Sequence, residues 1–215
     1  MVNKPRRRVH PGRTKWYLAS FFTSVLVVLL VVIYAHGIIY PPGQNFGYAR
    51  IDTSLGSFEV ELFKSSVPAT VVNFENLATG GFYTNLTWHR IEKNFVIQTG
   101  DPNTKNGGGN RSKWGFGSNG SPIAFESSPD LHNYRGYLAM ASTAPYVGGT
   151  SQFYINLSNN TSLDGKYAVF GKVLADGMKV VDQIGSVPTI YNSAAGIDEP
   201  VSPVLVYSVT IISRP

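Results

Sequence analysis

The feature that most restricts how this chain can fold is a long segment without charge. Residues 16–49 contain no Asp, Glu, Lys or Arg. The centre of this segment, LASFFTSVLVVLLVVIYAHGII, holds about the twenty apolar residues that cross the hydrocarbon core of a bilayer. We therefore expect a single transmembrane helix over residues 16–40, a short linker over 41–45, and one folded domain over 46–215.

The residues that flank this segment predict its orientation. Six basic residues and no acidic one precede it: Lys4, Arg6, Arg7, Arg8, Arg13 and Lys15. The positive-inside rule keeps such a tail, residues 1–15, in the cytoplasm and sends the domain across the membrane. A cleaved signal peptide is the alternative, because Ala35-His36-Gly37 fits a cleavage site. The apolar run exceeds the roughly 7–15 residues of a signal peptide, which favours a retained signal-anchor.

Asn-x-Ser/Thr sequons agree with a domain outside the cytoplasm, in a secretory lumen or at the cell exterior. Such sequons are acceptors for N-glycans in secreted proteins. Six occur, and one of them, Asn156, is expected to continue a strand and to be covered. The remaining candidates for a glycoprotein are Asn85, Asn110, Asn119, Asn159 and Asn160. The chain has no cysteine, so disulfides and thiol chemistry are excluded.

The charge of the domain argues against nucleic-acid binding. The net charge of +5 comes from the tail, since residues 16–215 hold 12 of the 18 basic residues and all 13 acidic ones. A nucleic-acid-binding domain requires a basic face of its own. The four histidines are far apart in the sequence and show no metal-ligand spacing. We therefore expect no nucleic acid, no metal and no cofactor.

Alternating and helical patterns predict a mostly β domain. Short strands are expected at residues 48–52, 58–63, 95–98, 138–141, 152–157, 168–174 and 204–212. Two helices interrupt them, one with Pro68 in its first turn and one that begins at Asp176 as its N-cap. Many short strands with two helices favour a closed antiparallel β-barrel that the helices cap.

Residues 87–101, TWHRIEKNFVIQTGD, carry the strongest functional signal. A cation, Arg90, shortly precedes an alternating run that ends in a Gly-Asp turn. In a strand, Phe95 and Ile97 would share one face, and Val96 and Gln98 the other. A guanidinium and an amide beside apolar side chains suit a ligand with both a carbonyl and an apolar ring. A peptidyl-proline is such a ligand.

The segment WHRIEKNFVIQTGDP resembles the core motif of the cyclophilins, which are peptidyl-prolyl cis-trans isomerases. Further similar segments follow in the family's order: GYLAMAS at 136–142, GGTSQFYI at 148–155 and LDGKYAVFGKV at 163–173. With ARIDTSLGSFEVELF at 49–63, the resemblance runs from about Phe46 to the C-terminus. It implies the cyclophilin fold, a monomeric catalytic domain, proline-containing polypeptides as substrates, and rotamase activity without a cofactor. An anchored isomerase of this type would assist protein folding outside the cytoplasm, as a chaperone does.

The resemblance also implies which residues form the site. Arg90 would donate to the prolyl nitrogen, with Phe95 and Gln98 beside it in the catalytic group. His89 would be a structural hydrogen-bonding residue and not a general base. The residues that would bind substrate are Val96, Ala141, Ser142, Gln152, Tyr154, Leu163 and Tyr167.

Four positions depart from the family's usual residues. Ser162 stands where cyclophilins commonly carry Trp, and Tyr167 where they carry His. Tyr154 replaces the usual Phe, and Val96 the usual Met. The loss of the Trp makes cyclosporin-like macrocycles poor ligands. These departures leave a second hypothesis open, in which the domain binds proline-containing segments without rapid turnover.

Overall fold

The computed structural model describes residues 47–120 and 122–213. The chain divides into two units, residues 1–44 and 45–215, and the described residues lie in the second. Within the described ranges, no helix combines the length and apolar character that a membrane span needs. The predicted anchor at 16–40 lies outside these ranges.

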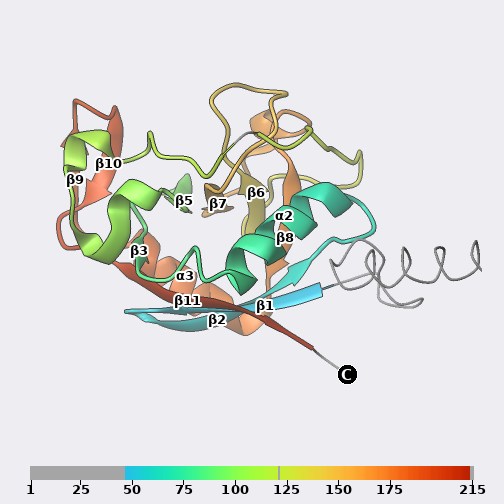
Figure 1. Ribbon diagram of the computed structural model, residues 1–215, viewed down its shortest axis with the longest axis horizontal. Coiled ribbons are helices and arrows are strands. Elements are labelled where there is room, and N and C mark those ends of the chain that lie inside the picture. Colours follow the sequence, from blue (N-terminus) through green and yellow to red (C-terminus); the bar gives the residue numbers. More distant parts are fainter. Residues whose placement is uncertain (1–46, 121, 214–215) are drawn as a thin grey trace, which may run out of the picture. The chain divides into compact units, whose positions relative to one another are not determined.

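Nine strands form one antiparallel sheet (Figure 1). In spatial order they are β3 (Leu86–Thr87), β11 (Leu205–Ile212), β1 (Gly47–Thr53), β2 (Gly56–Leu62), β8 (Val169–Val173), β6 (Tyr137–Met140), β7 (Phe153–Asn156), β5 (Val96–Thr99) and β4 (Arg90–Glu92). The strands predicted at 48–52 and 58–63 are confirmed as β1 and β2, which form a hairpin whose register runs from Gly47 opposite Leu62 to Thr53 opposite Gly56.

The sheet is open, so the expectation of a closed barrel is wrong. Its edge strands are β3 and β4, and no ladder joins them in the described part of the chain. Only Trp88 and His89 separate these two strands in the sequence. The backbone N–H of Trp88 donates to Val204 O at 2.9 Å, which continues the pairing of β3 with β11.

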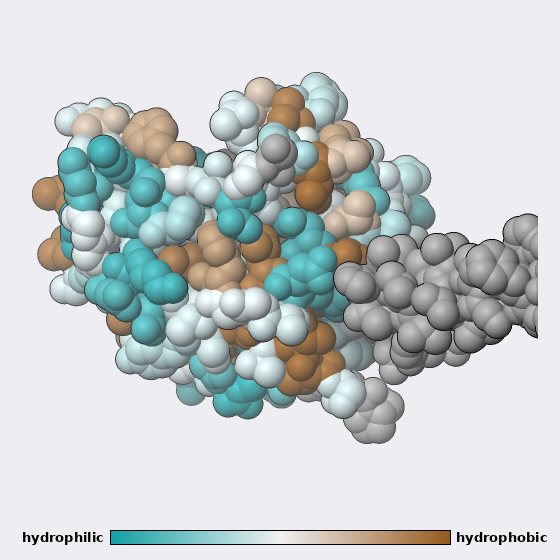
Figure 2. Space-filling model, viewed as in Figure 1, coloured by the Kyte–Doolittle hydropathy of each residue, from teal (hydrophilic) through white to brown (hydrophobic). Residues whose placement is uncertain are grey.

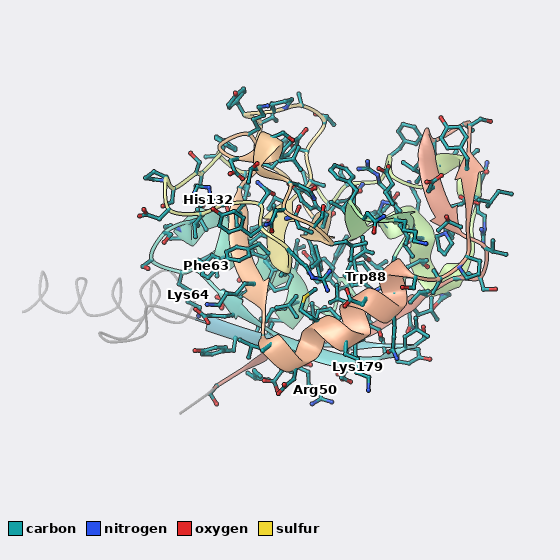
Figure 3. All side chains as sticks on the ribbon, turned by 180° about the vertical axis from the view of Figure 1, so that it is seen from behind. Arg50, Phe63, Lys64, Trp88, His132 and Lys179 are labelled. Atoms are coloured by element: carbon teal, nitrogen blue, oxygen red, sulfur yellow. The ribbon has the colours of Figure 1, made fainter. Side chains whose placement is uncertain are left out.

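Two α-helices cover the sheet, as the sequence predicts. Figure 1 shows α2 (Pro68–Thr79) nearest the viewer, and Figure 3, seen from behind, shows α3 (Met178–Gly185) nearest. Pro68 occupies the first turn of α2 as expected. The expected N-cap of the second helix is wrong: a 3₁₀ turn, η4 (Ala175–Gly177), precedes α3, and Gly177 is the N-cap residue. The side chain of Asp176 makes no capping bond because the residue lies inside that turn.

An aromatic cluster lies between α2 and the sheet. Phe74 of α2 contacts Tyr83, Phe153 and Phe170 with ring centroids 5.2–5.5 Å apart. Trp88 joins the cluster edge-on to Phe153 at 5.9 Å and lies inside the molecule (Figure 3). All five rings are at most 1% exposed, so this cluster fixes the strands that carry the site.

The segments that connect the predicted strands contain more secondary structure than the sequence predicts. The Gly-, Asn- and Ser-rich loop after β5 contains two 3₁₀ helices, η1 (Pro102–Gly107) and η2 (Arg111–Lys113), and η3 (Thr161–Leu163) follows β7. A separate hairpin, β9 (Thr189–Asn192) with β10 (Ile197–Pro200), precedes β11. On the face shown in Figure 2, apolar residues form small patches between hydrophilic ones.

Candidate active site

Three neighbouring strands bring three of the predicted site residues into one row. Arg90 of β4 lies opposite Gln98 of β5, and Gln98 lies opposite Tyr154 of β7. Directly opposed residues in an antiparallel pair point to the same face of the sheet. The next row, Ile91, Ile97 and Ile155, points to the other face and is at most 1% exposed. Alternation therefore divides these strands into a core face and a site face.

The site face borders a cavity of about 200 Å³. Nine of the ten predicted site residues line it: Arg90, Phe95, Val96, Gln98, Ala141, Ser142, Tyr154, Leu163 and Tyr167. The cavity thus has one cationic side, one amide, and otherwise largely aliphatic and aromatic walls. This combination suits a small apolar ring that is attached to carbonyl groups.

The Phe95 side chain lies on a different face from the one that strand alternation predicts. We expected Phe95 to share a face with Ile97, but Ile97 is fully buried in the core and Phe95 lies beside Val96 in the cavity wall. The reason is that Phe95 precedes β5. Asn94 has a φ of 61°, and the N–H of Phe95 donates to Glu92 O at 3.0 Å, so a turn sets its direction.

Arg90 is held at the cavity by acceptors on two strands. Its Nε donates to Glu92 Oε1 at 2.7 Å, its Nη2 lies 2.6 Å from the same oxygen, and its Nη1 donates to Gln98 Oε1 at 3.1 Å. Its Cζ lies 5.7 Å from the centre of the Phe95 ring. A guanidinium has five N–H groups, so these three contacts fix its plane and leave two donors for a ligand.

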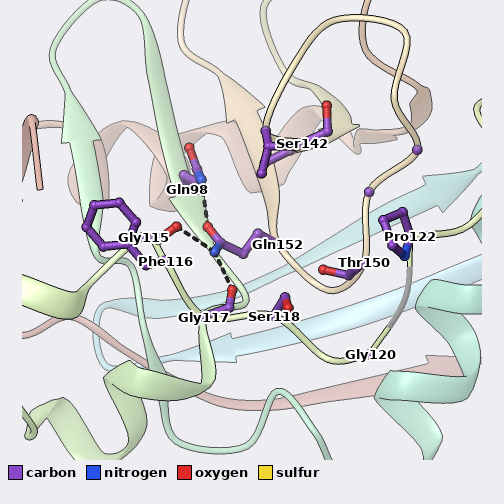
Figure 4. Close-up of a pocket in the computed structure, with 14 residues that line it drawn as sticks. Gln98, Gly115, Phe116, Gly117, Ser118, Gly120, Pro122, Ser142, Thr150 and Gln152 are labelled. Carbon is purple, nitrogen blue, oxygen red and sulfur yellow. Dashed lines mark hydrogen bonds between the residues drawn. The ribbon is translucent and has the colours of Figure 1, made fainter.

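Gln152 does not line this cavity but supports it from an adjoining one. Its Oε1 accepts from Gln98 Nε2 at 2.8 Å, and its Nε2 donates to Gly115 O at 3.0 Å and Gly117 O at 2.7 Å. Figure 4 shows this chain of bonds. The adjoining cavity measures about 290 Å³ and shares Gln98, Ala141 and Ser142 with the first. Sequence reasoning missed this second cavity, whose other lining comes mainly from loops.

Comparison with known proteins agrees with this geometry. The sequence pattern of the cyclophilin type peptidyl-prolyl cis-trans isomerase/CLD family matches residues 48–211. A peptidyl-prolyl cis-trans isomerase-like 1 of Aspergillus oryzae is 41% identical over 164 residues, which cover 76% of this chain and 94% of that protein. The chain belongs to the cyclophilin family. It is a peptidyl-prolyl cis-trans isomerase, and the hypothesis of an enzyme is confirmed at this level.

Further relatives of this cyclophilin extend the match to bacteria and to solved structures. A peptidyl-prolyl cis-trans isomerase of Acinetobacter baylyi is 40% identical over 171 residues, covering 76% of this chain and 85% of that protein. A cyclophilin type isomerase of Cryptosporidium parvum has a crystal structure that matches with a TM-score of 0.68 at 31% identity, covering 79% of this chain and 99% of that one. A second structure, determined in the presence of the dipeptide Ala-Pro, gives a TM-score of 0.66.

The departures from the usual cyclophilin residues have different consequences. Tyr154 and Tyr167 both line the cavity, with ring centroids 6.2 Å apart and nearly perpendicular planes. Ser162, in contrast, is exposed in η3 and does not line the cavity. Burial raises the pKa of the Tyr154 hydroxyl, so this group is a neutral hydrogen-bond donor at physiological pH.

His89 next to Arg90 is buried and not part of the cavity. It is fully buried, and burial lowers its pKa to about 4 although the nearby Asp101 carboxylate acts in the opposite direction. A neutral, inaccessible imidazole does not serve as a general base toward a ligand in the cavity. Its burial agrees with a structural and not a catalytic role, but the predicted hydrogen bonding is not found, because neither ring nitrogen has a hydrogen-bond partner among the described residues.

The sequons differ in their accessibility. Asn110, Asn119 and Asn159 are exposed, whereas Asn85 is half-buried with a φ of 60°. Asn156 is fully buried, as expected. The side-chain nitrogen of Asn160 donates to Phe95 O at 2.9 Å and to Asn156 Oδ1 at 2.8 Å. The fold therefore presents three of the six side-chain amides openly to modification.

Proposed function

We propose that Arg90 is the principal catalytic residue of this isomerase and that the 200 Å³ cavity holds the proline ring. Amide resonance gives rotation about a peptide bond a barrier of about 18–20 kcal/mol. In the twisted transition state resonance is lost, and the prolyl nitrogen accepts a hydrogen bond. A donor that meets this nitrogen only in the twisted form lowers the barrier without a nucleophile or a metal.

The hydrogen bonds of Arg90 support this proposal. Glu92 and Gln98 hold its plane, two of its N–H donors have no partner in these contacts, and Arg90 lines a cavity of suitable size. Phe95, Val96, Tyr154, Leu163 and Tyr167 would surround the ring, and Ala141 and Ser142 would offer backbone groups to the peptide. The adjoining cavity would receive side chains of residues that precede the proline.

A protease-coupled assay of the full chain tests this assignment. We expect Arg90→Ala to lower kcat by roughly 10²–10³-fold, which is the usual effect of removing a donor to developing charge. Arg50→Ala is the matched control, because Arg50 is exposed and pairs only with Asp52 of its own strand among the described residues. Equal rates for Arg90→Ala and Arg50→Ala would remove Arg90 from the mechanism.

We further propose that the enzyme acts outside the cytoplasm, held by residues 16–40 and assisting the folding of proline-containing polypeptides. Support comes from the uncharged segment, the basic tail and the exposed sequons Asn110, Asn119 and Asn159. Glycosidase treatment and protease protection of the native protein, with N-terminal sequencing, provide the test. A protein without glycans whose domain faces the cytoplasm would contradict this proposal.

A further inference from the structure

Tyr154 brings a hydroxyl group to a cavity that otherwise receives an apolar ring. This side chain lines the cavity and is only 5% exposed. Its hydroxyl donates to Asn133 Oδ1 at 2.8 Å. Since a buried hydroxyl without a partner is costly, the orientation of the Tyr154 ring depends on this acceptor.

Asn133 is itself held firmly. It is fully buried, its backbone N–H donates to Asp164 Oδ1 at 2.7 Å, and its Nδ2 lies 3.2 Å from the same oxygen. The other oxygen of Asp164 contacts His132 Nδ1 at 2.8 Å, and His132 lies away from the core (Figure 3). Asp164 directly follows Leu163, a cavity residue. One polar cluster therefore links two walls of the cavity.

We propose that Asn133 is a positioning residue that fixes the Tyr154 ring, and with it the shape of the proline cavity. Asn133 does not line the cavity, and its Oδ1 accepts from the Tyr154 hydroxyl at 2.8 Å and more weakly from Asn156 Nδ2 at 3.3 Å. The inference rests on the proposed role of the cavity as the proline site. Without this acceptor, the hydroxyl would seek water at the cavity mouth, and the ring would move into the space that proline needs.

The test compares Asn133→Leu, Tyr154→Phe and the double variant in the full chain. Asn133→Leu removes the acceptor at similar volume, while Asn156 Nδ2 keeps Tyr137 O as a partner at 3.0 Å. We expect Asn133→Leu to raise KM for an X-Pro peptide roughly tenfold with little change in kcat, as expected when ground-state and transition-state binding are lost equally. Adding Tyr154→Phe removes the unpaired hydroxyl and should restore KM to within about twofold of Tyr154→Phe alone.

If Asn133 only stabilised the fold, adding Tyr154→Phe would not restore the KM of the Asn133→Leu variant. If Asn133→Leu alone fails to fold but the double variant folds and works, the coupling is equally supported. The inference is overturned if Asn133→Leu leaves KM unchanged. It is also overturned if Asn133→Leu raises KM equally with Tyr154 and with Phe at position 154, or if the double variant does not fold. The Arg90→Ala variant distinguishes a failure of this inference from a failure of the proposed function. If Arg90→Ala is inactive and Asn133→Leu has the KM of the wild type, only the positioning role of Asn133 is wrong.

Discussion

At the scale of residues, the site depends on side chains that hold one another. Arg90, Gln98 and Gln152 form a continuous chain of hydrogen bonds that ends on the carbonyls of Gly115 and Gly117. Preorganised donors of this kind need no reorganisation when the substrate twists. The position of the guanidinium is therefore a property of the network and not of Arg90 alone.

We predict that Gln98→Leu lowers kcat roughly tenfold while the fold persists. The substitution removes the acceptor of Arg90 Nη1 and the donor to Gln152 Oε1, so the guanidinium gains freedom. Gln183→Leu, at an exposed position of α3, is the control. Steady-state kinetics with an X-Pro peptide provide the measurement, and an unchanged kcat would show that the network does not position Arg90.

The sequence predicts many of the residues that form the site but not all of them. Residue type and spacing indicate Arg90 and Gln98, because alternation in a strand places side chains at known faces. Asn133 gives no such signal, since it bonds to Tyr154 across 21 positions and lies outside any strand. The turn at Asn94 likewise redirects Phe95 in a way that a period-two pattern does not contain.

At the scale of elements, α2 shows how a distant residue completes a helix. Its N-cap residue, Val67, provides no side-chain bond. Glu126 does so instead: its oxygens accept from Ala69 N at 3.1 Å, from Thr70 N at 2.7 Å and from Thr70 Oγ1 at 2.7 Å. A carboxylate at a helix N-terminus also interacts favourably with the helix dipole.

Glu126→Ala should therefore lower the free energy of unfolding by about 1–2 kcal/mol, the usual cost of a lost N-cap. Asp130→Ala, in the same connection but exposed, should have little effect. Chemical denaturation of both variants measures the difference. Equal stabilities would show that Glu126 does not cap α2 in solution.

Element boundaries were predicted unevenly for physical reasons. The hairpin β1–β2 and helix α2 follow local rules, namely alternation around a Gly turn and a proline at the first helical position. The β9–β10 hairpin was missed because β9 is largely exposed and β10 has the sequence IDEP, so neither strand shows apolar alternation. Arg111, which donates to Glu199 Oε1 and Pro200 O, attaches this hairpin to η2 through long-range contacts.

At the scale of the whole molecule, burial of His89 links stability to pH. The ordinary pKa of 6.5 applies to the unfolded chain, and burial lowers the pKa to about 4 in the folded one. Between these values the unfolded state binds a proton that the folded state does not. This contribution is therefore fully present above pH 6.5 and is lost as the pH falls toward 4.

We predict that the free energy of unfolding falls by up to about 3 kcal/mol across this range because of His89 alone. His89→Gln removes the titrating group and should flatten the decline between pH 7 and pH 4.5. Urea titrations of both proteins at several pH values give the two slopes. Parallel slopes would assign the acid sensitivity to other groups.

The topology of the whole sheet was predicted only in part. Seven of the nine strands of the sheet and their antiparallel pairing follow from the pattern of short strands. The sequence did not predict β3 and β4, and closure depends on whether these two strands pair. In the structure β3 pairs with β11, and the bond from Trp88 N to Val204 O extends that pairing between residues 116 positions apart, a contact without a local signature. The family resemblance supplied the site residues that local patterns alone do not bring together.

The most direct test of the catalytic account is exchange spectroscopy on an X-Pro peptide at equilibrium, with the full chain and its Arg90→Ala variant. The wild type should accelerate both directions of isomerisation without changing the cis-to-trans ratio. In Arg90→Ala the exchange rate at saturating peptide should fall roughly 10²-fold or more, with peptide affinity nearly unchanged, because Arg90 stabilises the twisted form alone. An unchanged exchange rate, or a loss that weaker peptide binding fully explains, would contradict the account.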